Sequence, residues 1–567
     1  MISATLHGAT IIVRADSQDA RLIQRIPGTT RTAKMPGNTW NLPLSLDAYL
    51  HLKDNRAQMD EALLAEVAKM RRVQEWVEKT KSALVVEALK PPPLKPSFNL
   101  YNHQIKAYNL GLVLQHFAAL MDMGTGKSIT TVMITGRRFL DGKISRVLIV
   151  APTSVCAVWP REYAQFGDFP SRVITLLGER EKRLQGLRYL NAPPMRGQPE
   201  PLRVAVINYE STWRLEEELA AFKPDMIICD ESQRIKSPTA KQSKAMHRLA
   251  TGARYRMILT GTPVQNDTRD VWSQYKFLNP AIFGPNFYTF QQRFAIMGGV
   301  GNHQYLGPRN LDELTRKTHS IAYRITKEEC LDLPEQTFED FVVELDEKTR
   351  RIYRQIQKES VAIIEGGEVT ANNVLVRLLR LQQITGGFLP ADDGPLKQIN
   401  TAKLDALEDI VDSYCLGEGR KLVIFSRFTA ELDAIHERVT EVLAREGREH
   451  LTQVMICGDV PTQERGALVK QFQEDPVCRV FVGQIDACAE GITLTAASTI
   501  LYYSVNWNLA KYQQSLARIH RIGQQNACTY IHLVVPGTID TKIMAALKAK
   551  EDLARRVVDE WQTYFNE

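Results

Sequence analysis

Cysteine is scarce in this chain, and its spacing argues against a metal cluster. The 567 residues include 8 cysteines, with no Cys-x-x-Cys pair and no histidine beside one at ligand spacing. We therefore expect reduced thiols rather than disulfides or a zinc site.

Long apolar runs and a strong excess of one charge are also missing. No apolar run is long enough to cross a membrane, and Met1 to His7 lacks a basic region followed by an apolar one. A net charge of +6 is too mild to argue for nucleic acid. We expect a soluble, unsecreted protein that has no membrane partner. It would be cytoplasmic or in the nucleoid of a bacterium or phage, which the compact length favours, or nuclear in a eukaryote.

The composition is that of a globular protein. Hydrophobic residues make up 44% of the chain and charged residues 24%. A chain of 567 residues is too long for one core, and about three domains are expected.

A glycine-rich stretch, Met121 to Ser128, follows an apolar run and opens an amphipathic run from Ile129 to Leu140. A strand, a tight glycine turn and a helix in this order suit a phosphate-binding loop. Glycines let the main chain approach a polyphosphate, and the helix N-terminus presents unpaired N–H groups. The alternative is a glycine-capped turn before an ordinary helix.

The residues of this stretch have distinct predicted roles. The common pattern has glycine at Met121, but the turn depends on Gly124 and Gly126. Lys127 is expected on the β- and γ-phosphates of a nucleotide, and the Ser128 hydroxyl on Mg²⁺. The predicted nucleotide-binding residues of the loop are Met123, Gly124, Thr125, Gly126, Lys127 and Ser128.

An acidic pair follows a second apolar run, Met226 to Cys229. At the end of a buried strand, Asp230 is predicted to hold the magnesium ion, and Glu231 to orient and polarise the attacking water. The alternative is a solvated pair at a strand end, and it is disfavoured because the same chain carries the Lys127 loop.

Residues 1–90 read as a separate small α+β domain, and residues 91–97 as a stiff Pro-rich linker. Between Arg21 and Leu46 the chain has no acidic residue. A face that carries positive charges and no negative ones could bind a DNA backbone, and Trp40 could stack on a base. Equally, the cations could form a solvated rim over a core that contains Trp40. The nucleic-acid candidates are Arg21, Arg25, Arg31, Lys34 and Trp40.

Beyond the linker, continuous apolar runs alternate with helical patterns in two stretches. Strands that are buried on both faces indicate parallel sheets covered by helices, so the fold class is α/β. We predict an ATP-binding lobe over 98–330, with a helical insertion towards its end. A helical insertion and linker would follow over 331–400, and a second lobe ending in a brace helix over 401–567.

Several blocks occur in the order found in the Swi/Snf-type ATPases of helicase superfamily 2, which the chain resembles over nearly everything after Phe98. The resemblance implies two RecA-like lobes, DNA-stimulated ATP hydrolysis and translocation along duplex DNA. The blocks are Met123 to Ser128, Ala151 to Thr153, Asp230 to Lys236, Leu259 to Asn266, Ile424 to Arg427 and Arg518 to Gln524.

The resemblance also implies roles for single residues. Gln104 resembles the glutamine that reads the adenine edge. Arg518 and Arg521 resemble the arginines that the second lobe brings onto the γ-phosphate, where a planar guanidinium stabilises developing charge. The residues expected to couple the γ-phosphate to DNA contacts are Thr260, Gly261, Thr262 and Gln514.

Two departures from the family pattern are informative. Gln233 stands where the common motif has histidine, which puts the usual interdomain hydrogen bond in doubt. The segment from Gln484 to Leu494 lacks the family's usual lysine and paired glycines. This segment and the Arg518 block look more like the annealing-helicase branch, the HepA-related proteins, than like nucleosome remodellers. The N-terminal module weakly resembles the recognition domain of that branch.

The leading functional hypothesis is an ATP-driven translocase on duplex or branched DNA, serving repair, fork remodelling or recombination. It would use ATP and Mg²⁺ and act as a monomer on DNA. One alternative is an ATP-switched DNA-binding clamp with vestigial hydrolysis. Another is a transcription-associated translocase that acts on RNA polymerase. A decayed ATPase usually loses the lysine, the acidic base or an arginine finger, and all of these are present here.

Overall fold

The computed structural model of the protein describes residues 2–558 with gaps, and it divides them into two compact units. Unit 1 contains residues 1–330 and the chain from Leu553, and unit 2 contains residues 331–552. The residues outside the description are 1, 9, 17, 25, 27–28, 32–37, 195–196, 198, 300, 302–303, 331–332, 366–370, 392–393, 446–449, 489–491, 522 and 559–567.

The N-terminal part of unit 1 combines a small sheet with helices, and its separation as a domain of its own stays a prediction. Its five strands have the order β3-β4-β2-β1-β5; among the described residues, β1 and β5 pair in parallel and the other neighbours pair antiparallel. The strands are β1 (Ile2–His7), β2 (Thr10–Ala15), β3 (Thr30–Arg31), β4 (Thr39–Pro43) and β5 (Gln58–Met59). The helices are α1 (Ala20–Gln24), α2 (Leu46–Asp54) and α3 (Glu61–Ser82).

Trp40 belongs to the core of this small domain. It lies on β4 opposite Val13, is 2% exposed, and packs with the apolar side chains beneath the sheet. The interpretation of Trp40 as a base-stacking residue is therefore wrong, because a buried ring offers no free face. The alternative interpretation, a core tryptophan, is confirmed.

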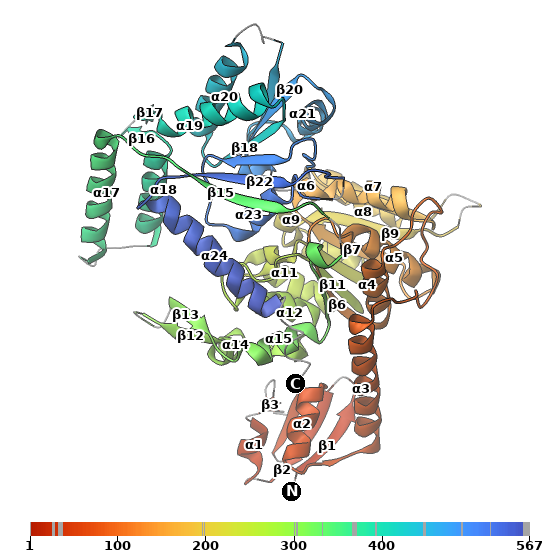
Figure 1. Ribbon diagram of the computed structural model, residues 1–567. Coiled ribbons are helices and arrows are strands. Elements are labelled where there is room, and N and C mark those ends of the chain that lie inside the picture. Colours follow the sequence, from red (N-terminus) through yellow and green to blue (C-terminus); the bar gives the residue numbers. More distant parts are fainter. Residues whose placement is uncertain are drawn as a thin grey trace. The chain divides into compact units, whose positions relative to one another are not determined.

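The larger lobe of unit 1 is built on a parallel sheet of seven strands, of which Figure 1 labels β6, β7, β9 and β11. The strand order is β14-β6-β11-β10-β7-β9-β8. The strands are β6 (His116–Met121), β7 (Arg146–Ala151), β8 (Ser171–Leu176), β9 (Leu202–Asn208), β10 (Met226–Asp230), β11 (Tyr255–Leu259) and β14 (Ala322–Ile325). The continuous apolar runs of the sequence correspond to these strands, which confirms the predicted class.

Helices cover both faces of this sheet. Alternate residues of one strand enter different cores: Ala118 and Leu120 of β6 join one cluster, and Phe117 and Ala119 join the other. The helices of the lobe are α4 (Asn102–Val113), α5 (Lys127–Leu140), α6 (Thr153–Cys156), α7 (Val158–Phe166), α8 (Arg180–Asn191), α9 (Tyr209–Thr212), α10 (Glu216–Ala221), η1 (Ser232–Ile235) and α11 (Lys241–Ala250).

The end of this lobe is mainly helical, as predicted, but two segments are extended. The glycine-rich stretch forms the hairpin of β12 (Ala295–Gly298) and β13 (Gln304–Pro308), and β14 returns to the sheet beside β6. The helices here are α12 (Asp270–Leu278), α13 (Pro280–Phe283), α14 (Phe287–Phe294), α15 (Leu311–His319) and α16 (Lys327–Cys330).

Unit 2 carries a second parallel sheet, of six strands, with the order β15-β22-β21-β18-β20-β19. The strands are β15 (Gln336–Val342), β18 (Leu422–Ser426), β19 (Thr452–Ile456), β20 (Cys478–Gln484), β21 (Thr499–Tyr502) and β22 (Cys528–Val534). The sequence predicts helices and a linker over 331–400, whereas β15 from that stretch is an edge strand of the sheet. Its largely exposed residues lack the apolar run that marks the other strands.

Helices also cover both faces of the second sheet, whose residues divide between two cores. Ile539, Ile543 and Leu547 of the last helix enter one of these cores, as expected for a brace helix. The helices are α17 (Glu347–Glu365), α18 (Ala371–Thr385), α19 (Ala402–Val411), η3 (Asp412–Gly417), α20 (Thr429–Leu443), α21 (Thr462–Glu474), α22 (Ile485–Cys488), α23 (Leu509–Leu516) and α24 (Ile539–Val558). A hairpin joins β16 (Phe388–Ala391) and β17 (Gly394–Gln398).

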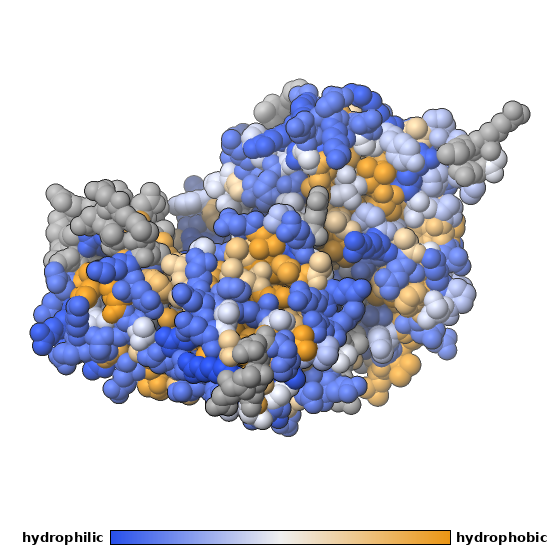
Figure 2. All heavy atoms as spheres, turned by 90° about the horizontal axis from the view of Figure 1, so that it is seen from above, coloured by the Kyte–Doolittle hydropathy of each residue, from blue (hydrophilic) through white to orange (hydrophobic). Residues whose placement is uncertain are grey.

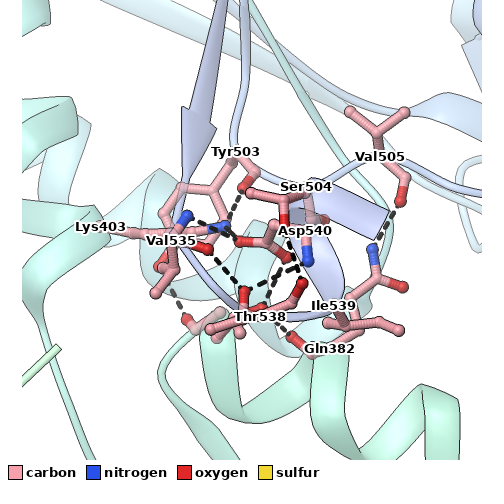
Figure 3. Close-up of polar contacts among 12 residues, drawn as sticks. Gln382, Lys403, Tyr503, Ser504, Val505, Val535, Thr538, Ile539 and Asp540 are labelled. Atoms are coloured by element: carbon pink, nitrogen blue, oxygen red, sulfur yellow. Dashed lines mark hydrogen bonds and ion pairs between the residues drawn. The ribbon is translucent and has the colours of Figure 1, made fainter. Parts of the chain in front are cut away.

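A buried ion pair fixes the helices of unit 2 to the end of its sheet (Figure 3). Lys403 of α19 donates to Asp540 of α24 at 2.8 Å and to the carbonyl of Tyr503 at 3.1 Å. The hydroxyl of Thr385 from α18 donates to the other oxygen of Asp540 at 2.8 Å. Lys403 is 2% exposed and Asp540 8%, so three helices meet at one buried charge pair, and removal of one partner would leave the other charge unpaired.

The surface gives no sign of a membrane span. None of the described helices combines the length and the apolarity that crossing a bilayer requires. On the face shown in Figure 2, hydrophilic residues predominate and the hydrophobic residues form small patches among them. All eight cysteines are free thiols, and the described residues contain no His, Cys, Asp and Glu cluster suited to a metal ion.

Candidate active site

Three neighbouring strands bring the predicted catalytic segments of unit 1 together. The phosphate loop follows β6, Thr260 follows β11, and Asp230 ends β10. Because β11 lies between β6 and β10 and all three strands are parallel, their carboxyl ends lie side by side. This edge is where open α/β sheets bind ligands.

The phosphate loop has the turn that its glycines require. Gly124 and Gly126 have φ angles of 85° and 92°, a left-handed conformation that strains other residues. A Cβ on Gly126 would also lie 2.1 Å from Nε2 of Gln104. The loop therefore needs glycine at this position for both its backbone conformation and the space beside Gln104.

Lys127 and Gln104 both contact the main chain of this loop. Lys127 Nζ donates to the carbonyls of Met121 (2.9 Å) and Asp122 (3.2 Å). Gln104 Nε2 donates to the carbonyl of Thr125 at 3.1 Å, and His103 Nε2 lies 2.8 Å from the same oxygen. Lys127 is thus held over the turn, and α4 is tied to it from the side.

Asp230 and Glu231 form a buried acidic pair, with exposed fractions of 7% and 8%. Burial and the adjacent Glu231 raise the pKa of Asp230 to about 7, although the ammonium of Lys127 and the indole N–H of Trp159 act to lower it. That N–H donates to Asp230 Oδ2 at 3.2 Å. Two carboxylates and a lysine at one strand edge are suited to a cation and a polyphosphate.

Glu231 has a strained backbone. Its φ of 52° and ψ of 56° are left-handed, which costs a residue other than glycine about 1–3 kcal/mol. Such strain persists where the surroundings hold it and is common at functional sites. The conformation starts the η1 turn and places Gln233 back against the Glu231 carboxylate.

Gln233 links the acidic pair to the segment after β11. Its amide nitrogen donates to Glu231 Oε2 at 2.7 Å, and its carbonyl oxygen accepts from the Thr260 hydroxyl at 2.8 Å. Thr260 Oγ1 in turn accepts from the backbone N–H of Thr262 at 3.0 Å. The residue that departs from the family pattern therefore lies in a continuous hydrogen-bonded relay within one lobe.

Arg324 is a site residue that the sequence reasoning missed. It lies on β14, is 9% exposed, and donates to Asp122 Oδ1 at 2.7 Å and to the carbonyl of Gly261 at 3.2 Å. It thus joins the phosphate loop to the Thr260–Thr262 segment. Arg324 is far from both in the sequence, and only the pairing of β14 with β6 brings it there.

The arginines of the second lobe differ in their surroundings. Arg518 is 2% exposed and donates to the carbonyls of Gln514 (2.7 Å) and Ile492 (2.8 Å). Arg521 is half-buried and donates to the Thr493 hydroxyl at 2.8 Å. Burial lowers the pKa of Arg521. Arg518 thus has a structural role in unit 2, whereas the action of either arginine on phosphate stays a prediction.

The N-terminal cations are only partly described. Arg21 on α1 and Arg31 on β3 are exposed, as a nucleic-acid contact requires. Arg25 and Lys34 lie outside the described residues. With Trp40 buried, the predicted face consists of cations and has no exposed aromatic ring from that position.

Two RecA-like sheets, of which one carries the phosphate loop and the acidic pair, define the class as a two-lobed P-loop ATPase of the helicase type. The family model of the SNF2-related domain matches residues 101–386, and that of the helicase conserved C-terminal domain matches residues 402–523. The chain therefore belongs to the SNF2-related family of helicase superfamily 2.

The chain is similar to several curated proteins over part of their length. It is 26% identical over 449 residues to the DNA repair and recombination protein RDH54 of Saccharomyces cerevisiae, covering 74% of this chain and 46% of that protein. It is 24% identical over 503 residues to the TATA-binding protein-associated factor MOT1 of the same organism, covering 77% and 26%. The chain thus spans less than half the length of these relatives.

Among solved structures, the chain is similar to the Sulfolobus solfataricus SWI2/SNF2 ATPase core in complex with dsDNA. The identity is 23% and the TM-score 0.40, with 83% of this chain and 99% of that chain covered.

Proposed function

We propose that the protein is an ATP-dependent DNA translocase that acts on duplex or branched DNA in repair, fork remodelling or recombination. The observation that carries the proposal is the meeting of Lys127 with the buried Asp230 and Glu231 at one edge of a parallel sheet, joined to Thr260 through Gln233. The repair function named for RDH54 is that of a relative, and it supports this pathway as a proposal.

The residues present fit an ATP-bound magnesium ion. The Ser128 hydroxyl and the Asp230 carboxylate are the hard oxygen ligands that Mg²⁺ prefers. A bound Mg²⁺ ion would neutralise phosphate charge as it develops. Lys127 would bind the β- and γ-phosphates, Gln104 the adenine edge, and Glu231 would accept a proton from the attacking water.

The second lobe would complete the catalytic site. Arg518 and Arg521 are proposed to stabilise the γ-phosphoryl charge in the transition state. Thr260, Gly261, Thr262 and Gln514 would couple that event to the DNA. The Gln233 relay supports the coupling role in the first lobe, because a change at Glu231 reaches Thr262 through two side chains.

An ATPase assay with single-stranded, duplex and forked DNA in parallel tests the proposal. We expect strong stimulation by duplex or forked DNA and weak or absent strand separation of a long plain duplex. The proposal would be contradicted if none of the three DNA substrates raised the rate of ATP hydrolysis above the rate without DNA. Turnover lost while ATP-dependent DNA binding remains would favour the clamp alternative instead.

A transcription-associated translocase is the second candidate function. The relative MOT1 is described as a TATA-binding protein-associated factor, and this description of a relative supports the second candidate. Capture of RNA polymerase by the full chain, together with ATP-dependent release of stalled polymerase from a template, would favour it over repair. ATP hydrolysis measured on forked DNA without polymerase separates the two candidates, because the repair candidate predicts stimulation there. The protein is proposed to act as a monomer on DNA.

A further inference from the structure

The hairpin of β12 and β13 is rich in glycine and carries no charge. The sequence from Phe294 to Pro308 has no aspartate, glutamate, lysine or arginine. Figure 1 shows the two strands extending from the end of α14. A two-stranded hairpin is only marginally stable by itself in water, so contacts with the rest of the lobe must hold this one in place.

One face of the hairpin packs on the chain that leads into α12. Met297 and Tyr305 lie opposite each other on the two strands. The Arg269 guanidinium lies over the Tyr305 ring, 5.3 Å from its centroid, and Nη1 of Arg269 is 4.0 Å from Sδ of Met297. At the root of the hairpin, the buried Thr268 hydroxyl donates to the carbonyl of Phe294 at 3.1 Å. This face is therefore attached to the lobe.

The chain that holds the hairpin is the continuation of the segment after β11. The Asp270 carboxylate accepts from the backbone N–H groups of Gln265 at 2.9 Å and Asn266 at 2.8 Å. These residues follow directly after Thr262, which the Gln233 relay reaches from the acidic pair. The hairpin is thus connected, through short and well-bonded chain, to the segment proposed to couple ATP hydrolysis to DNA.

The other face of the hairpin is apolar and open to solvent. Neighbouring residues of a strand point to opposite faces, so Ile296 beside Met297 and Leu306 beside Tyr305 point away from the packed face. Ile296 is 40% exposed and Leu306 59%. Gly298 makes room for Leu306, since a Cβ on Gly298 would lie 2.5 Å from Cδ1 of that leucine. Two large aliphatic side chains are therefore presented to a partner.

The charges that flank the hairpin are suited to nucleic acid. Arg293 precedes it and Arg309 follows it, with no acidic residue between them. Arg309 is exposed, and the Arg293 side chain is 40% exposed while it pairs with Glu313 at 2.8 Å. Proteins contact DNA phosphates with arginines and place leucine or isoleucine against base steps. An uncharged, aliphatic surface between two arginines fits the bases of DNA rather than its backbone.

We propose that the β12–β13 hairpin recognises the branch point of DNA by placing Ile296 and Leu306 on the open face of the last base pair. The interior of a plain duplex offers no such face, because each base pair is stacked on both sides. The inference rests on the proposed function and adds the element that selects branched DNA. Covering a base pair requires no strand separation, so it agrees with the weak unwinding expected above.

The test uses the full chain and two DNA probes. One is a fork with the fluorescent base aminopurine next to the branch point, and the other is a plain duplex closed by a loop at each end. We expect wild type to prefer the fork and to change the aminopurine fluorescence. Ile296→Ser with Leu306→Ser should lower the fork preference by about tenfold, as expected for lost burial of apolar side chains, and abolish the fluorescence change. Leu140→Ser, which changes a 47% exposed leucine of α5, is the matched control.

An unchanged fork preference and fluorescence response in the folded double variant would overturn the inference, and a protein partner would then fit this face better. Binding of the fork by wild type without a fluorescence change would overturn it as well. Circular dichroism shows whether the variants are folded, and Leu306→Ser alone decides the matter if the double variant is not. The proposed function fails separately, when none of the DNA substrates stimulates ATP hydrolysis by wild type, whereas failure of this inference leaves that stimulation intact.

Discussion

The Gln233 side chain donates to the Glu231 carboxylate at 2.7 Å while it accepts from the Thr260 hydroxyl. A glutamine amide has both a donor and an acceptor end, so Gln233 can link the carboxylate of Glu231, the predicted base, to the segment after β11. Gln233, which departs from the family pattern, thus forms hydrogen bonds to two segments of its own lobe.

Gln233→Ala should reduce DNA-stimulated ATP turnover more than the basal rate, because it breaks the relay but leaves Glu231 in place. Gln233→His restores the residue common in the family and is the conservative control. Steady-state ATPase assays with and without duplex DNA measure the ratio of the stimulated rate to the basal rate. Equal loss of basal and stimulated rates in the alanine variant would show that Gln233 merely supports Glu231.

The buried Asp230 should make the ligand-free protein less stable as pH rises. Its pKa is raised from 3.8 to about 7 by burial and Glu231, so the folded state holds the proton more tightly than the unfolded state does. The free energy of unfolding then falls between about pH 4 and pH 7. Asp230→Asn should lose this dependence and be more stable than wild type at pH 8, by at most about 4 kcal/mol.

Chemical denaturation at pH 5 and pH 8, without nucleotide and Mg²⁺, measures this difference. The same change in stability with pH in Asp230→Asn as in wild type would place the titration elsewhere.

The two arginines of the second lobe should give different phenotypes. Arg521→Ala should lower turnover by about 10³ to 10⁵ while ATP affinity stays nearly intact, because a finger acts on the transition state. Arg518→Ala should in addition destabilise unit 2, since it removes buried bonds to Gln514 and Ile492. Denaturation curves and ATP titrations separate the two effects. A steep loss of ATP affinity in Arg521→Ala would make it a ground-state ligand.

Breaking the buried ion pair of unit 2 should cost stability. Lys403→Met leaves the Asp540 carboxylate buried without its cation, which typically costs about 3–5 kcal/mol. The double variant Lys403→Met with Asp540→Leu should recover much of the loss, because no unpaired charge remains. Urea unfolding of wild type, the single variant and the double variant measures their free energies of unfolding. A single variant as stable as wild type would show that water reaches the site.

The N-terminal cations should contribute to DNA binding through phosphate contacts. Arg21→Gln and Arg31→Gln should each lower the slope of log affinity against log salt by about 0.7 to 0.9. Arg72→Gln, which changes an exposed arginine on α3, is the control. Salt titrations of binding to forked and plain duplex DNA provide the slopes. Unchanged slopes in both variants would leave DNA selection to the two lobes.

The sequence predicted those parts of the protein in which local pattern decides structure. Continuous apolar runs predicted the two parallel sheets, and Gly124 and Gly126 predicted the turn before α5. The exposed strand β15 was missed, because edge strands carry little apolar signal. Arg324 was missed because strand order brings it to Asp122, and Trp40 had two interpretations that only burial could separate.

The phosphate-site claim is tested most directly by ATP hydrolysis of the folded Lys127→Ala and Glu231→Gln variants beside wild type, each with and without duplex DNA. We expect duplex DNA to stimulate the wild-type rate. Both variants should lose hydrolysis, and only Glu231→Gln should keep ATP bound. Wild-type rates in folded Lys127→Ala would contradict the assignment of the active site.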